Sequence, residues 1–283
     1  MFLVTGANGQ LGQELKRIYK DKNIIFVSKE QLDITNEKKL SDFFAINRVE
    51  LVINCAAYTD VEQAENNIDL CYKANKDAIK NLAKFSKQYN FLIIHISTDY
   101  VFDGTNYLPY KESDKVNPIS IYGKSKLQGE VELFNNADRA IIIRSSWIYS
   151  EFNKNFLKTM LNLADNKKEI SVICDQIGTP TYAYDLAKII SEILSKIDIK
   201  NYNKKEIYHF SNEGIASWYD FAYEIMKISN KSCQVNPIKA KSYKTLAKRP
   251  YYSVLDKEKI KQDFGIEIRH WKEGLSDCLA RIV

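Results

Sequence analysis

The sequence predicts an α/β protein with a doubly wound, parallel sheet and a smaller C-terminal α/β domain. Through the first half of the chain, short apolar runs alternate with amphipathic stretches of helical period. Strands that are apolar throughout are buried on both faces, which is typical of a parallel sheet covered by helices. A second observation is a cluster of three glycines within the first twelve residues of a chain that has only ten.

The first predicted strand, Phe2–Thr5, runs into this glycine cluster. Gly6, Gly9 and Gly12 have the spacing G-x-x-G-x-x-G, and a helix is predicted over Leu11–Tyr19. A strand, a tight turn and a helix in this order form the Rossmann-type site, where backbone N–H groups and the helix N-terminus hold a pyrophosphate. An ordinary βα turn that uses glycine is the alternative. The concentration of glycine in a glycine-poor chain favours a dinucleotide site.

The remaining elements follow the same alternation up to Trp147, where the pattern changes. Further strands are predicted over Ile24–Val27, Leu51–Cys55, Phe91–Ser97 and Ala140–Arg144, and helices over Glu37–Phe44, Asn67–Tyr89 and Tyr122–Phe134. Later helices are predicted over Phe156–Ala164, Tyr184–Ile197, Ser217–Ile228, Asp256–Phe264 and Trp271–Ala280, and strands over Ser171–Ile173 and Ile207–Ser211. Ser217 is the expected N-cap of its helix. We expect residues 1–149 to form the dinucleotide-binding domain and residues 150–283 mainly the second domain, with the strand near 207–211 returning to the first sheet.

Composition excludes several classes of function. The net charge is +5, and no dense basic block interleaved with aromatic residues indicates nucleic-acid binding. No apolar run reaches the roughly 18 residues of a membrane span. Five scattered cysteines without C-x-x-C, and a fold that starts at residue 2 with no room for a signal peptide, predict a cytoplasmic protein with reduced thiols. The three histidines lack metal-ligand spacing, and His95 is expected to be a packed core residue.

Ligands bind at the carboxyl ends of parallel strands, so the residues that follow each strand are the candidate site. The third strand ends in Asn54-Cys-Ala-Ala-Tyr-Thr59, whose small residues allow a ligand to lie against the backbone. The fourth ends in Ser97, Thr98 and Asp99, two hydroxyls and a carboxylate. The alternative is an ordinary loop, since all three residue types favour loops.

Tyr122 and Lys126 are four residues apart and share one face of a predicted helix. A nearby ammonium would lower the tyrosine pKa from its usual value of about 10, and the phenol could then donate a proton to a carbonyl oxygen. The spacing alone is not informative, because Tyr-x-x-x-Lys also begins at Tyr72, Tyr107, Tyr184 and Tyr223. Tyr122 is distinguished by its place at a helix start just after the Ser97–Asp99 strand end.

Together these motifs resemble the extended short-chain dehydrogenase/reductase superfamily and, within it, the dTDP-4-dehydrorhamnose reductase family. The resemblance runs over nearly the whole chain. It rests on Thr5-Gly-Ala-Asn-Gly-Gln-Leu-Gly12, Asn54-Cys-Ala-Ala-Tyr-Thr59, Ser97-Thr-Asp-Tyr-Val-Phe-Asp-Gly104, Tyr122-Gly-Lys-Ser-Lys126, Arg144-Ser-Ser-Trp-Ile-Tyr149, Asp175-Gln-Ile-Gly-Thr-Pro-Thr181 and Arg249-Pro.

The resemblance implies reduction of the 4-keto group of dTDP-6-deoxy-L-lyxo-4-hexulose to dTDP-L-rhamnose. It makes Tyr122 the proton donor, Lys126 its partner and ribose ligand, and Thr98 a hydrogen-bond partner of the reacting carbonyl. Asp99 and Trp147 would contact the sugar, and Arg249 the diphosphate of the nucleotide. The cofactor would meet Gly6, Gly9, Gln10, Leu11 and Gly12 at its pyrophosphate, and elsewhere Ala56, Ala57, Tyr58, Ser97, Tyr122 and Lys126. Related 4,6-dehydratases carry Thr-Asp-Glu where this chain has Thr98-Asp99-Tyr100, so reduction without dehydration is expected.

The sequence departs from related proteins after the second strand and at a position where some family members bind a metal ion. Ser28 and Lys29 follow the second strand, where NAD-preferring sites carry an acidic residue, so NADPH is expected to serve at least as well as NADH. Asp33 and Ile34 are expected beside the adenine. Some family members hold Mg²⁺ between subunits through carboxylates. Glu14 matches one such position, but Tyr184 replaces a second acid, so Glu14 is expected to be an exposed acid near a helix start rather than a metal ligand.

The same motifs are also compatible with other functions. The protein could be an epimerase or another reductase of nucleotide-bound ketosugars, acting as a monomer or a homodimer. A different class is a non-catalytic regulatory subunit, because the regulatory beta subunit of methionine adenosyltransferase resembles the same family. The intact set of Thr98, Tyr122 and Lys126 favours an enzyme.

Overall fold

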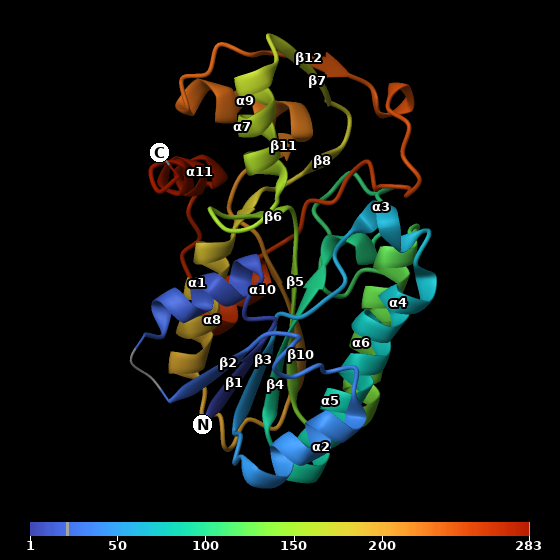
Figure 1. The fold of residues 1–283 in the computed structure, drawn as a ribbon, viewed down its shortest axis with the longest axis vertical. Coiled ribbons are helices and arrows are strands. Elements are labelled where there is room, and N and C mark those ends of the chain that lie inside the picture. Colours follow the sequence, from blue (N-terminus) through green and yellow to red (C-terminus); the bar gives the residue numbers. More distant parts are fainter. Residues whose placement is uncertain (21–22, 283) are drawn as a thin grey trace.

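The computed structural model describes residues 1–20 and 23–282, and its centre is a six-stranded sheet (Figure 1). In spatial order the strands are β10 (Lys205–Phe210), β5 (Ala140–Ser145), β4 (Leu92–Thr98), β3 (Leu51–Asn54), β1 (Phe2–Thr5) and β2 (Ile24–Val27). All neighbours are parallel, which confirms the predicted doubly wound sheet and the return of a strand near residues 207–211. The chain order reverses between β1 and β3, and this switch point opens a crevice at the carboxyl ends of the strands.

Helices cover both faces of this sheet (Figure 1). On one face lie α1 (Gln10–Ile18), α8 (Ala183–Lys196) and α10 (Glu258–Phe264), and on the other α2 (Glu37–Ile46), α5 (Ala78–Tyr89) and α6 (Ile121–Asn136). Successive strand residues alternate between the two cores, because side chains along a strand point to opposite faces. Val4, for example, belongs to the first core and Leu3 to the second.

The helix predicted over Asn67–Tyr89 is interrupted. It follows α3 (Val61–Ala64) and consists of α4 (Ile68–Tyr72), a π-helical turn η1 (Lys73–Asp77) and α5. The wider turn contains Asn75, which is fully buried and exchanges two hydrogen bonds with the backbone of Tyr58. π-Turns often occur at functional sites, and this one ties the helix to a segment that follows β3.

The second part of the chain is built from short strand pairs and helices, arranged above the carboxyl ends of the sheet in Figure 1. Its strand pairs are β6 (Ile148–Tyr149) with β9 (Thr181–Tyr182), β7 (Glu169–Ile173) with β12 (Gln234–Ile238), and β8 (Ile177–Gly178) with β11 (Ala216–Ser217). Its helices are α7 (Phe156–Asn166), α9 (Trp218–Ile228) and α11 (Trp271–Leu279), and it has a short 3-10 turn, η3 (Ala240–Ser242). Another 3-10 turn, η2 (Asp99–Val101), directly follows β4 in the first part. Ser217 caps α9 as predicted, in a reciprocal capping box with Asp220. The division at residue 149 stays a prediction, since α8, β10 and α10 pack against the first sheet.

Glu14 lies in α1 at the junction of the two parts, and its expected exposure is wrong. The residue is completely buried, 3.6 Å from Arg17. Arg17 also pairs with Glu151 at 2.7 Å, and Tyr182 donates a hydrogen bond to the same carboxylate. Packing of segments distant in sequence therefore encloses an acid that looked like a helix-surface residue. No group of three or more His, Cys, Asp or Glu residues within 1–20 and 23–282 is arranged to hold a metal ion.

Burial, and then the neighbouring Glu151 carboxylate, raise the pKa of Glu14 to about 8 against the opposing charges of Arg17 and Arg281. The folded state therefore keeps a proton that the unfolded chain releases near its ordinary pKa of 4.5. The resulting stability is complete below the unfolded pKa and is lost as the pH rises through the folded pKa. We expect the free energy of unfolding of the wild type to fall between about pH 5 and pH 9, and that of Glu14→Gln to fall less steeply. Urea unfolding across this range measures both slopes. The exposed Glu273→Gln serves as a control that keeps the wild-type slope, and equal slopes for wild type and Glu14→Gln would contradict the prediction.

Candidate active site

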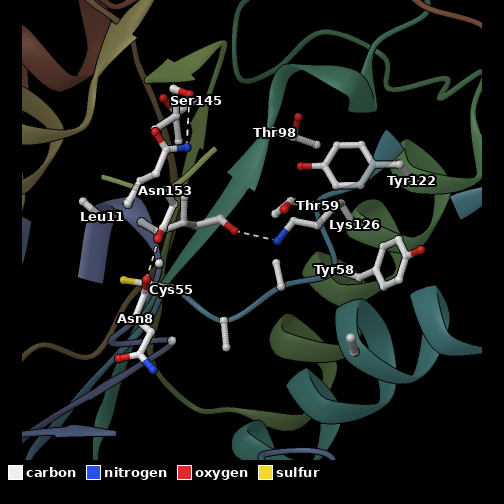
Figure 2. Close-up of a pocket in the computed structure, with 18 of the residues that line it drawn as sticks. Asn8, Leu11, Cys55, Tyr58, Thr59, Thr98, Tyr122, Lys126, Ser145 and Asn153 are labelled. Carbon is white, nitrogen blue, oxygen red and sulfur yellow. Dashed lines mark hydrogen bonds between the residues drawn. The ribbon is translucent and has the colours of Figure 1, made fainter. Parts of the chain in front are cut away.

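A cavity of about 730 Å³ opens at the carboxyl ends of β1, β3, β4 and β5. Its volume is in the range of small-molecule and cofactor sites. Figure 2 shows Asn8, Leu11 and Asn153 on one side of it and Thr98, Tyr122 and Lys126 on the other. The cavity therefore joins the glycine turn to the predicted catalytic residues, although they lie far apart in the chain.

The glycine turn forms one end of this cavity. Gly6 has φ +69°, and a Cβ atom there would lie 2.6 Å from the backbone nitrogen of Ala56. Helix α1 begins at Gln10 with Gly9 as its N-cap and no side-chain cap, so the first N–H groups are free to bind an anion. Of the residues predicted to meet the pyrophosphate, Gly6, Gly9, Gln10 and Leu11 line the cavity, whereas Gly12 does not. Gly12 is needed for packing instead, because a Cβ atom there would lie 2.4 Å from the Gly6 carbonyl oxygen.

A segment after β6 closes over the glycine turn, which sequence reasoning missed. Asn153 donates a hydrogen bond to the Asn8 carbonyl at 2.6 Å, and Ser150 and Asn155 donate to the Gln10 side chain at 3.1 and 3.0 Å. These contacts hold the turn against the segment 150–155. These features fit the pyrophosphate of a dinucleotide.

Ser28, Lys29, Asp33 and Ile34 all line the far end of the cavity, where the resemblance places the adenosine. The structure adds Glu30, whose carboxylate accepts a hydrogen bond from the Ser28 hydroxyl at 2.6 Å. An ammonium at Lys29 favours a ribose 2′-phosphate, and a carboxylate at Glu30 opposes it while suiting a free 2′-hydroxyl. The expectation that NADPH serves at least as well as NADH rests on Ser28 and Lys29 and leaves out the Glu30 charge.

Cofactor selectivity is therefore expected to depend on this pair of charges. Glu30→Gln keeps the hydrogen bond to Ser28 but removes the negative charge, and it should raise the ratio of kcat/KM for NADPH to that for NADH by about two- to fivefold. Lys29→Met should lower the same ratio. Steady-state kinetics with both cofactors measures it. A ratio that is unchanged in both variants would show that neither charge lies near the 2′-position.

The segment after β3 forms the cavity floor. Ala56, Ala57 and Tyr58 line it, and Asn75 fixes this segment. The Tyr58 N–H donates to Asn75 Oδ1 at 2.8 Å, and Asn75 Nδ2 donates to the Tyr58 carbonyl at 3.0 Å and to Ser125 Oγ at 3.0 Å. Asn75 is a functional residue that sequence reasoning missed. Its signal was an asparagine inside an apolar helical pattern, where this residue type is disfavoured unless its side chain has a specific partner.

Tyr122 lies in the first turn of α6 and Lys126 one turn further on. Ser120 caps this helix by accepting a hydrogen bond from the Gly123 N–H at 3.1 Å, and Glu65 accepts from the Ile121 N–H at 2.9 Å, so the start of the helix is fixed. Lys126 is 2% exposed, and its ammonium donates to the Ile96 carbonyl at 2.7 Å. Figure 2 shows Tyr122 beside Thr98, which ends β4.

The predicted lowering of the Tyr122 pKa is wrong for this structure. Burial raises the pKa of the phenol above its ordinary value, a hydrogen bond with Thr98 opposes this, and the charge of Asp99 adds to it. The Lys126 ammonium donates to the Ile96 carbonyl rather than to the phenol. Burial also lowers the pKa of Lys126 to about 8, against the carboxylate of Glu130. Tyr122 therefore holds its proton here, which suits a proton donor.

Asp99 and Trp147 line the end of the cavity where the resemblance places the sugar, which we call the sugar end. Asp99 is 2% exposed, accepts a hydrogen bond from Thr98 Oγ1 at 3.1 Å, and leaves Oδ2 with no partner among the described residues. Burial raises the pKa of Asp99 to about 7. Trp147 has a left-handed φ of +47° and stacks on Trp218 at 3.5 Å between ring centroids. Such strain in a non-glycine residue is concentrated at functional sites.

Two of the predicted site residues have their polar groups engaged elsewhere. Ser97 lines the cavity, but its hydroxyl donates to Glu130 at 2.5 Å. Arg249 does not line the cavity, and its guanidinium forms an ion pair with Glu62 of α3. The Leu246 N–H donates to the same carboxylate at 2.8 Å, so Glu62 ties the segment before Pro250 to α3.

Comparison with known proteins places this site in a family. The family model described as the RmlD substrate binding domain matches residues 1–283. The chain belongs to this family. An RmlD-family relative from Aggregatibacter actinomycetemcomitans, named dTDP-4-dehydrorhamnose reductase, is 41% identical over 98% of each chain.

Solved structures agree with this membership of the RmlD family. A dTDP-4-dehydrorhamnose reductase from Clostridium acetobutylicum has a TM-score of 0.94 and 41% identity over 99% of each chain. One from Bacillus anthracis in complex with NADP has a TM-score of 0.93 and 36% identity over 99% of this chain and 98% of that one. Across the part of the chain that the structure describes, no helix is both long and apolar enough to cross a membrane.

Proposed function

We propose that this protein reduces the 4-keto group of dTDP-6-deoxy-L-lyxo-4-hexulose with NADPH or NADH and forms dTDP-L-rhamnose. One observation carries the proposal: a single cavity joins the glycine turn to Thr98, Tyr122 and Lys126 in a chain of the RmlD family. Relatives of the same length carry the corresponding name, and one of them holds NADP. The substrate of this chain is then a nucleotide sugar.

When held in this cavity, a reduced nicotinamide would supply a hydride to C4 of the sugar. Tyr122 donates its phenol proton to the C4 oxygen, which becomes a hydroxyl. Thr98 donates a hydrogen bond to the same oxygen and stabilises the negative charge that develops there. The ammonium of Lys126 binds the cofactor ribose and stabilises the Tyr122 phenolate left after proton transfer. The raised pKa of Tyr122 keeps the proton in place until the oxygen has gained charge.

The sugar end determines what is reduced. We assign Asp99 to the sugar hydroxyls and Trp147 to the apolar face of the 6-deoxy ring. Tyr100 follows Asp99 where a dehydratase needs a second acid, and burial raises its pKa above the ordinary value, so it supplies no such acid. For Arg249 to contact the diphosphate, it has to separate from Glu62.

The remaining assignments extend the same proposal. Residues 1–149 bind the dinucleotide, and the later residues, apart from those that join the first sheet, bind the nucleotide sugar. All five cysteines are free thiols, which suits a cytoplasmic enzyme. The protein acts as a monomer or a homodimer and needs no nucleic acid or membrane.

The test is turnover with the ketosugar generated in situ. Loss of absorbance of the reduced nicotinamide, together with chromatographic identification of dTDP-L-rhamnose, is the expected result with NADPH and NADH. Tight nucleotide binding without turnover on this ketosugar would overturn the proposal. It would then favour another ketosugar or the regulatory-subunit alternative.

A further inference from the structure

A buried row of polar side chains runs behind Lys126, and the reaction described above does not use it. It consists of Thr5 at the end of β1, Asn54 at the end of β3 and His95 in β4. Thr5 is paired in register with Asn54, and Asn54 with His95, so the three side chains lie side by side across neighbouring strands. None of them is more than 1% exposed. The row begins next to Gly6 of the cofactor turn and ends at the lysine.

The distances show an unbroken row of polar contacts. Thr5 Oγ1 donates to Asn54 Oδ1 at 2.6 Å, and Asn54 Nδ2 lies 2.9 Å from His95 Nδ1. The other ring nitrogen, His95 Nε2, lies 3.4 Å from Lys126 Nζ. His95 is thus more than the packed core residue that the sequence predicted. Both of its ring nitrogens face polar atoms.

A neutral imidazole carries one N–H donor and one lone pair that accepts. The hydrogen bonds along the row can therefore be arranged in two ways, which differ in the ring nitrogen of His95 that carries the hydrogen. Burial, and then the charge of Lys126, lowers the pKa of His95 well below its ordinary value, which leaves the ring neutral. If Asn54 Nδ2 donates to Nδ1, the ring hydrogen is on Nε2 and faces the lysine donor to donor. If the Asn54 side-chain amide is rotated by 180°, its oxygen accepts a hydrogen bond from the His95 Nδ1–H. The lone pair of His95 Nε2 then faces Lys126. Thr5 accommodates both arrangements, because a hydroxyl donates or accepts.

An ammonium has three N–H donors and no acceptor, so a buried one is stable only when acceptors surround it. The Ile96 carbonyl accepts one of the Lys126 hydrogens. We infer that His95 is a positioning residue for the proposed reaction: as the Nδ1–H tautomer, held by Asn54, it accepts a second Lys126 hydrogen at Nε2. The third N–H is then directed to the cavity, which Lys126 lines. This inference rests on the role proposed above for Lys126.

Nuclear magnetic resonance of the wild-type protein, labelled with nitrogen-15 in its three histidines, tests the tautomer. We expect the His95 signal to show a protonated Nδ1 and an unprotonated Nε2, with and without NADP⁺. His209→Gln and His270→Gln assign the other two signals. A His95 ring protonated on Nε2 would overturn the inference. This readout requires no turnover, so it stands or falls separately from the proposed function.

Two matched variants test the consequence for catalysis. Glutamine at position 95 can place a carbonyl oxygen near the site of Nε2, whereas asparagine reaches only the site of Nδ1. We expect His95→Asn to lose about 10- to 100-fold in kcat, as expected for a displaced catalytic group, and His95→Gln to lose much less. Thermal melting of both variants controls for stability. Equal loss of kcat in two equally folded variants would contradict a positioning role, and if either variant fails to fold, the tautomer measurement still decides.

Discussion

Tyr122→Phe is expected to lower kcat by about 10²- to 10⁴-fold, the usual contribution of a general acid, while nucleotide binding is retained. The change removes one hydroxyl and keeps the ring that packs edge-on against Tyr100 at 5.7 Å between centroids. Because burial raises the pKa of the Tyr122 phenol, this proton is present over the physiological pH range. Steady-state turnover and calorimetric titration with NADPH measure the two effects separately.

The matched control is Tyr208→Phe. Tyr208 lies in β10 outside the cavity, and its hydroxyl donates to Asp263 at 2.8 Å. The same loss of one hydroxyl there should leave kcat unchanged. If Tyr122→Phe turned over at the wild-type rate, Tyr122 would not be the proton donor, and a group such as Asp99 would have to take that role.

Glu130→Gln is expected to lower the free energy of unfolding by about 3–5 kcal/mol, the cost of leaving a buried charge without its partner. Glu130 pairs with Arg144 at 2.7 Å, and the two side chains are 4% and 3% exposed. Ser97 also donates to this carboxylate. The variant leaves a guanidinium buried between β5 and α6 with no compensating charge. Urea unfolding of wild type and variant measures the difference.

The exposed ion pair of Lys87 with Asp138 is the control for this prediction. These side chains are each 65% exposed and 3.4 Å apart. Asp138→Asn makes the same change from acid to amide and should cost less than about 1 kcal/mol. Equal losses in the two variants would show that burial does not determine the contribution of the Glu130–Arg144 pair.

The parts of the structure that repeat a local pattern could be predicted from the sequence. The alternation of apolar runs predicted a parallel sheet, and the separate strand candidate near residues 207–211 became β10 of its six strands. The rule that ligands bind at carboxyl ends of parallel strands predicted that Thr98 and the segment Ala56–Tyr58 would meet the glycine turn, and they share one cavity.

The errors concern quantities that depend on tertiary packing. Glu14 was expected on the surface because it lies near a helix start. Its burial depends on the segments of Glu151 and Tyr182, which lie far away in the sequence. The Tyr122 pKa was expected to fall because helical spacing places Lys126 on the same face of the helix. This spacing does not reveal that the phenol is buried or that the ammonium donates to the Ile96 carbonyl. Asn75 and Glu30 were missed because each acts through a hydrogen bond to a segment that only the fold brings within reach.

Transfer of a labelled hydride tests the central claim most directly. The ketosugar, generated in situ, is reduced with NADPH that carries deuterium at the reactive carbon of the nicotinamide, and the product is examined by mass spectrometry and proton NMR. Our account predicts dTDP-L-rhamnose with one deuterium bound at C4 of the sugar. Deuterium at another carbon, a product of different configuration at C4, or an unchanged ketosugar in the presence of bound cofactor would contradict it.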